Sequence, residues 1–321
     1  MYRPVTLIAA VATMVFFAAA TSACMPETTP TNGTASQHTE SFALEQFKLD
    51  AFTVLYRFKV TPGENTVIRP VLTHPENASD AGLKTLAQWV AANATKPEAN
   101  SGTARAVAAI NAGYFDPNNG QSASWIELDK KTLANPTQNS RLTENRSLAP
   151  YLPQIFDRSE TQTLSCNATP GHPNNVVTQR IARHSAPLPT GCVLVQALGA
   201  GPALLPDVMT AAADEAFYAP KKGRDPLGIL KKNARSALAI TPEGQIWFVM
   251  VQQTQPNGGL TLPELANWLR AEGALQALAL DGGSSSALWT PETGIKLGLV
   301  KSDGTRPQRA LHSLLVVYAQ R

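Results

Sequence analysis

The sequence of 321 residues lacks the features that mark several large classes of protein. Its formal net charge is only +3, and a balance that small argues against a nucleic-acid binder held by phosphate neutralisation. No internal repeat is present, which argues against solenoids and propellers. After residue 23 no apolar run is long enough to span a membrane. We therefore expect no nucleic-acid partner, and contact with a membrane only through the N-terminus.

Common active-site signatures are also missing. A nucleophile elbow needs Gly-x-Ser-x-Gly, but Ser286 stands where the last glycine belongs, which argues against a serine hydrolase built on Ser284. The glycine-rich stretch 199–205 has Leu204 in place of the third glycine of a dinucleotide loop. His172 and His184 match no metal-binding spacing. These absences leave hydrolases of other types and binding proteins.

Cysteine is scarce, with three residues in the whole chain: Cys24, Cys166 and Cys192. No Cys-His-Asn pattern accompanies them, so a cysteine nucleophile is not indicated. In an exported chain the compartment allows disulfides to persist, and we predict that Cys166 pairs with Cys192. Closing this loop would stabilise the fold by about 3 kcal/mol through the entropy of the unfolded chain.

The N-terminus has the pattern of an export signal. Within residues 1–23, Arg3 is the only charge, an apolar run follows, and small residues end it, as in a secretory signal peptide. The residues before Cys24 resemble the bacterial lipoprotein box, in which the cysteine is lipidated, although Thr21 stands where leucine is usual. Residues 24–40 suit a flexible tether. We expect a periplasmic or membrane-anchored lipoprotein of a bacterial envelope, with secretion as the alternative.

Residues 41–321 are predicted to form the folded domain, of the α+β class, with a mixed β-sheet core and packed helices. Alternation predicts a half-buried strand at 54–60, paired with 67–73 through the turn 61–63. A capping box of Thr261 and Glu264 predicts a helix that ends at Gly273. Residues 118–193 are rich in Asn, Pro, Ser and Thr, and we interpret them as an irregular insertion that is stapled by the disulfide and would cover the site.

A polar cluster follows the apolar run 274–280, in the sequence Asp281-Gly282-Gly283-Ser284-Ser285-Ser286. An apolar run of strand length that stops at such residues indicates a buried strand delivering a polar cluster to its end. Apolar walls can perturb the pKa of the carboxylate, and the two glycines allow positive φ or close approach to a ligand. The alternative is a plain turn, which Asp, Gly and Ser form for local reasons.

Polar residues lie at the ends of other predicted strands. The run 105–110 leads into Asn111 and Asp116, which either face a ligand or belong to a turn. Arg235 and Arg309 each stand just before a strand, and the strand after Arg235 is predicted to form a hairpin, 237–241 with 246–251, through the turn 242–244. Glu264 is accounted for by capping alone.

Six segments in this order resemble the phosphodiester glycosidase family, named for the lysosomal uncovering enzyme that removes N-acetylglucosamine from a sugar phosphodiester. They are Ile110-Asn111-Ala112-Gly113-Tyr114-Phe115, Gly201-Pro202-Ala203-Leu204, Arg235-Ser236-Ala237, Gly259 to Ala266, Leu280 to Ser286, and Arg309. The resemblance covers about residues 50–320 apart from 118–193. The family often has glycine where this chain has Ser284, so Ser285 is the serine that corresponds.

The resemblance implies hydrolysis at the anomeric carbon of a sugar joined through phosphate, on an envelope or extracellular glycan. Asp281 would be the base or nucleophile, Asn111 a ligand for hydroxyl or phosphate, and Arg235 and Arg309 the phosphate-binding residues, because guanidinium groups bind phosphate oxygens bidentately. The substrate-binding residues would be Gly113, Gly282, Gly283, Ser284, Ser285 and Glu264.

We expect no required cofactor, and a divalent cation stays open because Asp281, Asp116 and Asn111 offer hard oxygen ligands. The alternative of another class is a non-catalytic envelope lipoprotein that binds anionic glycans through the same arginines. The enzymatic hypothesis makes one structural demand: Asp281, Arg235 and Arg309 must converge on one site.

Overall fold

The computed structural model describes residues 42–63, 65–74, 82–98, 103–168 and 175–320. The predicted signal peptide, Cys24 and the tether lie outside these residues. Three main sheets carry the fold, and the two strands of each neighbouring pair run antiparallel. No helix in the described part of the chain is both long and apolar enough to cross a membrane.

The first sheet has six strands. The Asp281 cluster follows one of them, and Arg235 begins another. Its order is β1 (Phe42–Lys48), β2 (Thr53–Val60), β13 (Ile246–Gln253), β12 (Arg235–Ile240), β14 (Gln276–Ala279) and β11 (Ala203–Leu205). The predicted hairpin is confirmed as β12 and β13, in which Ala237 pairs with Val249.

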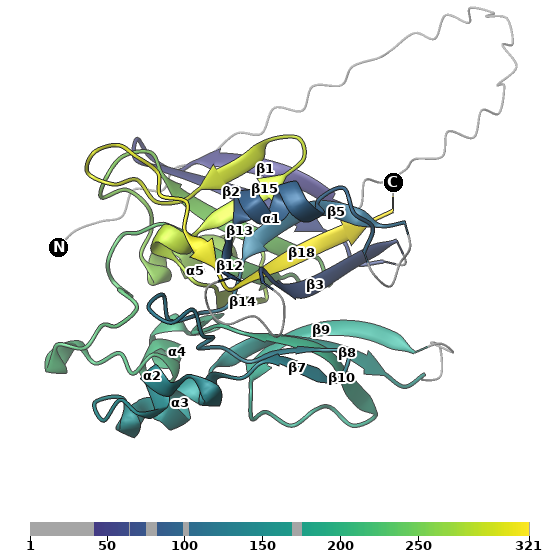
Figure 1. The fold of residues 1–321 in the computed structure, drawn as a ribbon, viewed down its shortest axis with the longest axis horizontal. Helices are drawn as coiled ribbons and strands as arrows, with labels where there is room; N and C mark the ends of the chain where they lie inside the picture. The colour runs from purple at the N-terminus through teal and green to yellow at the C-terminus, as the bar shows by residue number, and fades with distance from the viewer. Residues whose placement is uncertain (1–41, 64, 75–81, 99–102, 169–174, 321) are drawn as a thin grey trace, which may run out of the picture. The chain divides into compact units, whose positions relative to one another are not determined.

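The second sheet has five strands, in the order β16 (Gly294–Leu297), β15 (Ala287–Thr290), β5 (Arg105–Asn111), β18 (Ser313–Ala319) and β3 (Thr66–Leu72). The third has the order β7 (Lys131–Ala134), β6 (Ile126–Leu128), β10 (Cys192–Gly199), β8 (Ser159–Cys166) and β9 (Val176–Arg183). Figure 1 shows these last strands side by side as a sheet of their own. A short pair joins β4 (Lys84–Thr85) to β17 (Ala310–Leu311).

The α-helices of the described residues are α1 (Leu86–Asn93), α2 (Ser140–Thr143), α3 (Leu152–Phe156), α4 (Val208–Glu215) and α5 (Leu262–Ala271). Single 3₁₀ turns are η2 (Pro136–Gln138), η3 (Ala149–Tyr151), η4 (Pro220–Lys222) and η5 (Gly283–Ser285). The predicted capping box is confirmed on α5, where Thr261 Oγ1 accepts from Glu264 N and the Glu264 carboxylate accepts from Thr261 N. Gly273 follows α5 with φ +98°, a conformation that favours glycine.

Apolar side chains fill both faces of the first sheet. One cluster joins Phe58 and Phe248 to Ile110 of the second sheet and Leu198 of the third. A second cluster lies on the other face and includes residues of α4 and α5, and a third packs α1 on the second sheet. The fold class is α+β, as predicted.

Strand β2 differs from the prediction in two ways. It is buried on both faces, because the first sheet has a core on each side. Arg57, expected to face solvent, is buried with its guanidinium 4.5 Å from the Trp247 ring and 2.6 Å from Glu45. The predicted pairing with 67–73 is wrong, because both edges of β2 are taken by β1 and β13, and β3 pairs with β18 instead.

The interpretation of 118–193 as irregular is also wrong, since the segment supplies most of the third sheet. Its strands escaped detection because polar side chains occupy their buried positions: Glu160 and Gln162 are both 2% exposed and hydrogen-bond each other at 2.6 Å. The predicted disulfide is confirmed, because Cys166 and Cys192 are bonded and lie opposite each other on β8 and β10.

Candidate active site

The loop after β14 is fixed between two sheets by backbone hydrogen bonds. Leu280 N donates to Ser236 O at 2.9 Å, and Asp281 N donates to Ala112 O at 2.9 Å. Gly283, with φ +61°, donates its N–H to Ala234 O at 2.8 Å. The Asp281 loop is therefore held at the start of β12 in the first sheet and at the end of β5 in the second.

Asn111, the last residue of β5, ties this junction together with its side chain. Nδ2 donates to Asp281 O at 2.5 Å, while Oδ1 accepts from Ser236 Oγ at 2.6 Å and from Ala287 N at 3.1 Å. The residue is 1% exposed. Asn111 thus positions the Asp281 loop. To bind a ligand as well, as the sequence predicted, its side chain would need a further contact besides these three hydrogen bonds.

The Asp281 carboxyl group has an environment that suits acid–base chemistry near neutral pH. Burial raises its pKa to about 6, while the Ser285 hydroxyl, the Gly282 N–H and the Arg309 guanidinium favour the charged form and limit the rise. A carboxyl with such a pKa is largely ionised at pH 7 and still exchanges a proton readily. The sequence prediction that apolar walls act on this carboxylate agrees with this arrangement.

Arg309 lies beside the same carboxylate. Its Nη1 donates to Ser284 Oγ at 3.2 Å, and its guanidinium is 5.8 Å from the centre of the Phe115 ring. Its charge lowers the pKa of Asp281. Asp281, Ser284, Ser285 and Arg309 therefore lie close together.

Arg235 also reaches the site, but its donors are directed elsewhere. A Cβ at Gly282 would lie 3.8 Å from Arg235 Cδ, which places the arginine against the Asp281 loop. Its guanidinium donates four hydrogen bonds to backbone carbonyls at 2.5–3.2 Å, those of Leu227, Gly228, Lys231 and Leu260. Since an arginine has five N–H groups and four are used here, bidentate binding of phosphate by Arg235 requires at least one of these carbonyls to be released.

Two residues of the site were not singled out from the sequence. The Tyr114 hydroxyl donates to Leu280 O at 3.4 Å, and its pKa is raised by burial and by the Asp281 charge. The Arg158 guanidinium lies 5.3 Å from the centre of the Tyr114 ring. Tyr114 belonged to a motif already noted, whereas Arg158 lies in 118–193, where no pattern pointed to it.

Other predicted site residues have clear structural contacts. A Cβ at Gly113 would meet Gly199 O at 3.0 Å, so glycine allows close packing there. Glu264 is exposed, and its contacts join it to Thr261 at 2.8 Å and to Lys232 at 4.0 Å. These bonds connect Glu264 to the start of α5 and not to the Asp281 loop.

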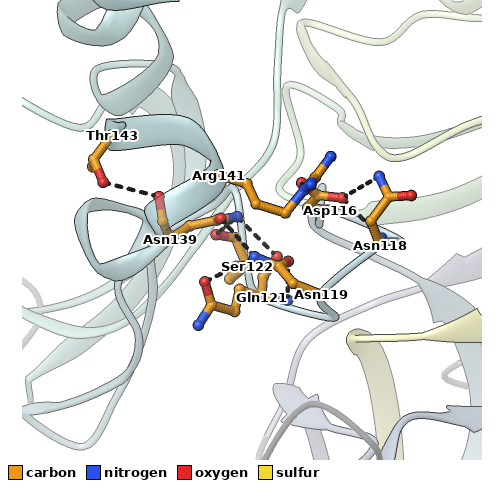
Figure 2. Close-up of polar contacts among 8 residues, drawn as sticks. All are labelled: Asp116, Asn118, Asn119, Gln121, Ser122, Asn139, Arg141 and Thr143. Atoms are coloured by element: carbon orange, nitrogen blue, oxygen red, sulfur yellow. Dashed lines mark hydrogen bonds and ion pairs between the residues drawn. The ribbon is translucent and has the colours of Figure 1, made fainter. Parts of the chain in front are cut away.

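Asp116 lies in a separate polar network, drawn in Figure 2. Its Oδ2 accepts from Arg141 Nε at 2.8 Å, and its Oδ1 accepts from both N and Nδ2 of Asn118 at 2.8 Å. Burial opposes ionisation, but these hydrogen bonds outweigh it and lower the pKa of Asp116. Within the described residues no three His, Cys, Asp or Glu side chains gather in a way that could hold a metal ion.

One hollow of the described residues lies away from Asp281. A cavity of about 570 Å³ is lined by β3, β9 and the β12–β13 turn, including Ile68, Val177 and Gly244. A hollow of about 10 Å³ beside the Asp281 loop is lined in part by Ser284, Ser285 and Arg309. We assign the site by its converging polar groups, because cavity size alone carries no chemistry.

Comparisons with known proteins concern the family and the fold of the chain. The family model of the phosphodiester glycosidases matches residues 104–318. The catalytic domain of the zebrafish N-acetylglucosamine-1-phosphodiester alpha-N-acetylglucosaminidase, auto-inhibited by its pro-peptide, has a similar fold, with a TM-score of 0.58 and 16% identity over 88% of this chain and 86% of that one. A hypothetical protein from Synechocystis gives a TM-score of 0.53 and 17% identity over 87% of this chain, which spans 62% of that protein.

At these identities the structural likeness concerns the fold. No curated protein matches the sequence. The family model, however, covers about two thirds of the chain and includes Asn111, Arg235, Asp281 and Arg309. The chain therefore belongs to the phosphodiester glycosidase family.

Proposed function

We propose that this protein hydrolyses a glycosyl phosphodiester at the anomeric carbon of the sugar. The observation that carries the proposal is that the Asp281 carboxylate, which follows β14, lies near the Arg309 guanidinium, which precedes β17. The chain belongs to a family of phosphodiester glycosidases. A carboxylate near the anomeric carbon and a cation near the phosphate are the two charges that this reaction needs.

The bond that breaks joins the anomeric carbon to a phosphate oxygen, and its electron pair leaves with the phosphate. The phosphate is a weak base, so its departure depends more on neutralising its charge than on protonating it. Water supplies the hydroxyl group at the anomeric carbon, either directly, with its proton passing to Asp281, or after an ester with Asp281 has formed. In both cases Asp281 must be ionised at the start, as a pKa of about 6 allows at pH 7.

The surrounding residues hold these groups in place. Asn111 fixes the backbone of Asp281, Ser285 hydrogen-bonds its carboxylate, and Ser284 accepts a hydrogen bond from Arg309. Such preorganised donors are worth on the order of a hundredfold in rate each. The catalytic charges therefore do not need to reorganise when the substrate binds.

We further propose that the enzyme acts outside the cytoplasm, on an envelope or extracellular glycan. The pattern of residues 1–23 and the cysteine at position 24 support this location. Incorporation of labelled palmitate into the wild type but not into Cys24→Ser tests the lipid anchor. Equal labelling of both, or of neither, would contradict it.

Turnover of defined glycosyl phosphodiesters tests the activity. We expect the wild type to release free sugar, and Asp281→Asn to lose at least a hundredfold in kcat/KM because the charged group is removed. The matched control is Asp303→Asn, which changes an exposed aspartate bonded to Thr305 and should keep full activity.

Three results would contradict the proposal. The first is no release of sugar from any phosphodiester, and the second is full activity of Asp281→Asn. The third is inactivation of turnover by a serine-directed fluorophosphonate. Binding of anionic glycans by wild type and Asp281→Asn alike, without turnover, would instead support the non-catalytic binding protein.

A further inference from the structure

Two consecutive aromatic residues in the loop after β5 each contact an arginine. The Arg158 guanidinium lies 5.3 Å from the centre of the Tyr114 ring, and the Arg309 guanidinium lies 5.8 Å from the centre of the Phe115 ring. A ring face attracts a guanidinium and restrains its orientation without using its N–H groups. The loop thus presents two oriented cations, of which only Arg309 was expected from the sequence.

One nitrogen of the Arg158 guanidinium is fixed by a hydrogen bond, and the two terminal nitrogens are not bonded. Its Nε donates to Glu215 O at 3.0 Å. Glu215 is itself fixed, because its carboxylate accepts from Ser159 N at 2.7 Å and from Ser159 Oγ at 2.9 Å. Among the described residues, no carboxylate lies within 4.0 Å of the Arg158 guanidinium and no hydrogen bond uses its two terminal nitrogens.

The two terminal nitrogens of Arg158 can therefore donate two hydrogen bonds to one anion. The residue is partly exposed, and its unbonded terminal nitrogens are not among the fully buried side-chain nitrogens that lack a partner. Arg235 differs in both respects, since it is 5% exposed and gives four hydrogen bonds to carbonyls. A phosphate would meet free donors at Arg158 and occupied ones at Arg235.

Tyr114 connects Arg158 to the Asp281 loop. Its ring lies under the guanidinium, and its hydroxyl hydrogen-bonds the carbonyl of Leu280, the residue before Asp281. The phenol is also close enough to feel both charges, that of Asp281 and that of Arg158. Tyr114 thus links the Arg158 guanidinium to the residue that precedes Asp281.

We propose that Arg158 binds the phosphate group of the substrate, in the role that the sequence assigned to Arg235. The inference rests on the proposed function and sharpens its substrate class, since it requires an anionic group on the leaving side of the sugar. Arg235 then acts as a positioning residue that clamps the loop 227–231 beside the Asp281 loop. The segment 118–193 supplies a substrate-binding residue of the site.

The kinetic test compares two substrates with the same sugar, a glycosyl phosphodiester and a neutral p-nitrophenyl glycoside. For Arg158→Gln we expect kcat/KM on the phosphodiester to fall about a hundredfold, with less than a threefold change on the neutral glycoside. Arg158→Lys, which keeps the charge but not the fork, should recover about tenfold of that loss. The control Arg270→Gln removes an exposed arginine of α5 and should change neither substrate.

A binding test works without turnover. We expect methyl phosphate, titrated calorimetrically at pH 7, to bind Arg158→Gln about tenfold more weakly than the wild type or Arg270→Gln. Thermal unfolding checks that each variant is folded, and Arg158→Lys replaces Arg158→Gln if the latter is not. Equal phosphate affinity in folded variants, or equal losses on both substrates, overturns the inference. Phosphate binding that depends on Arg158, in a wild type that hydrolyses no phosphodiester, overturns the proposed function alone.

Discussion

Arg235 and Arg309 look alike in the sequence and differ in the fold. Each stands at the start of a strand, and the same phosphate-binding role was predicted for both. Arg235 is buried and donates to four backbone carbonyls, whereas Arg309 is partly exposed and donates one hydrogen bond, to Ser284. The comparison shows that an arginine can bind a ligand only with the N–H groups that have no acceptor within the protein. Its position in a sequence motif does not reveal how many of these remain.

The difference follows from where the two strands lie. Strand β12 is paired on both sides, by β13 and β14, and the chain before it folds back over Arg235 with Gly228 at φ +61°. Strand β17 belongs to a two-stranded pair, so the residues before it have fewer neighbours. An arginine before a central strand is therefore enclosed by carbonyls, and one before a short outer strand keeps free donors.

The largest effect should come from removing the enclosed arginine. Arg235→Ala leaves one buried and three partly buried carbonyls without donors, and we expect it to lower the free energy of unfolding by about 4 kcal/mol. Arg309→Ala removes one partly exposed hydrogen bond and should cost less than about 1 kcal/mol. Chemical denaturation of both variants measures the contrast. Equal losses of stability would break the comparison.

Much of the site's framework could be predicted from local sequence, because local physics fixes it. The Thr261–Glu264 capping box, the β12–β13 hairpin and the strand that ends before Asp281 all formed where the pattern placed them. Each depends on residues close in the chain, so their signals survive in the sequence. The disulfide was predictable too, since only two cysteines remained to pair.

The failures share a cause, which is that burial was decided by distant elements. The alternation at 54–60 predicted a half-buried strand, but Arg57 is buried as well, because Glu45 and the Trp247 ring compensate its burial. Strands β8 and β9 carry Thr, Gln and Arg, and only the hydrogen bond of Arg180 Nε to Gln162 at 2.7 Å explains why such residues face each other. Arg158 could not be found at all, since the ring that orients it is 44 positions away.

The next effect concerns the carboxylate of Asp281, whose pKa is lowered by the charge of Arg309. The pKa of Asp281 is raised from 3.8 to about 6, so its protonation stabilises the folded state fully below pH 3.8, and that stabilisation is lost as pH rises through 6. Asp281→Asn cannot ionise, so we expect it to be more stable than the wild type at pH 8 by about 3 kcal/mol, with the gain vanishing near pH 4. Thermal melts across this range measure the trend. A gain that does not depend on pH would show that burial does not raise this pKa.

A kinetic contrast between the two arginines comes third. We expect Arg309→Ala to lower kcat/KM on a glycosyl phosphodiester about a hundredfold while the protein stays folded, because a donor aimed at developing charge is lost. Arg235→Lys, measured below its unfolding temperature, should have a smaller effect on kcat/KM than on stability. If Arg235→Lys loses more activity than Arg309→Ala without losing stability, then Arg235 binds the phosphate and the two roles are exchanged.

The smallest effect is a shift in the acid limb of the pH–rate profile. Arg309 favours the ionised form of Asp281, so Arg309→Gln should raise the pKa of that carboxyl and move the acid limb to higher pH. Arg235 is engaged with carbonyls and is not among the groups that set this pKa, so Arg235→Lys should leave the limb in place. Profiles of kcat/KM between pH 4 and 8 measure both variants. A shift of the acid limb in Arg235→Lys but not in Arg309→Gln would mean that Arg235, and not Arg309, acts on the Asp281 carboxylate. That result would contradict the contacts that distinguish the two arginines.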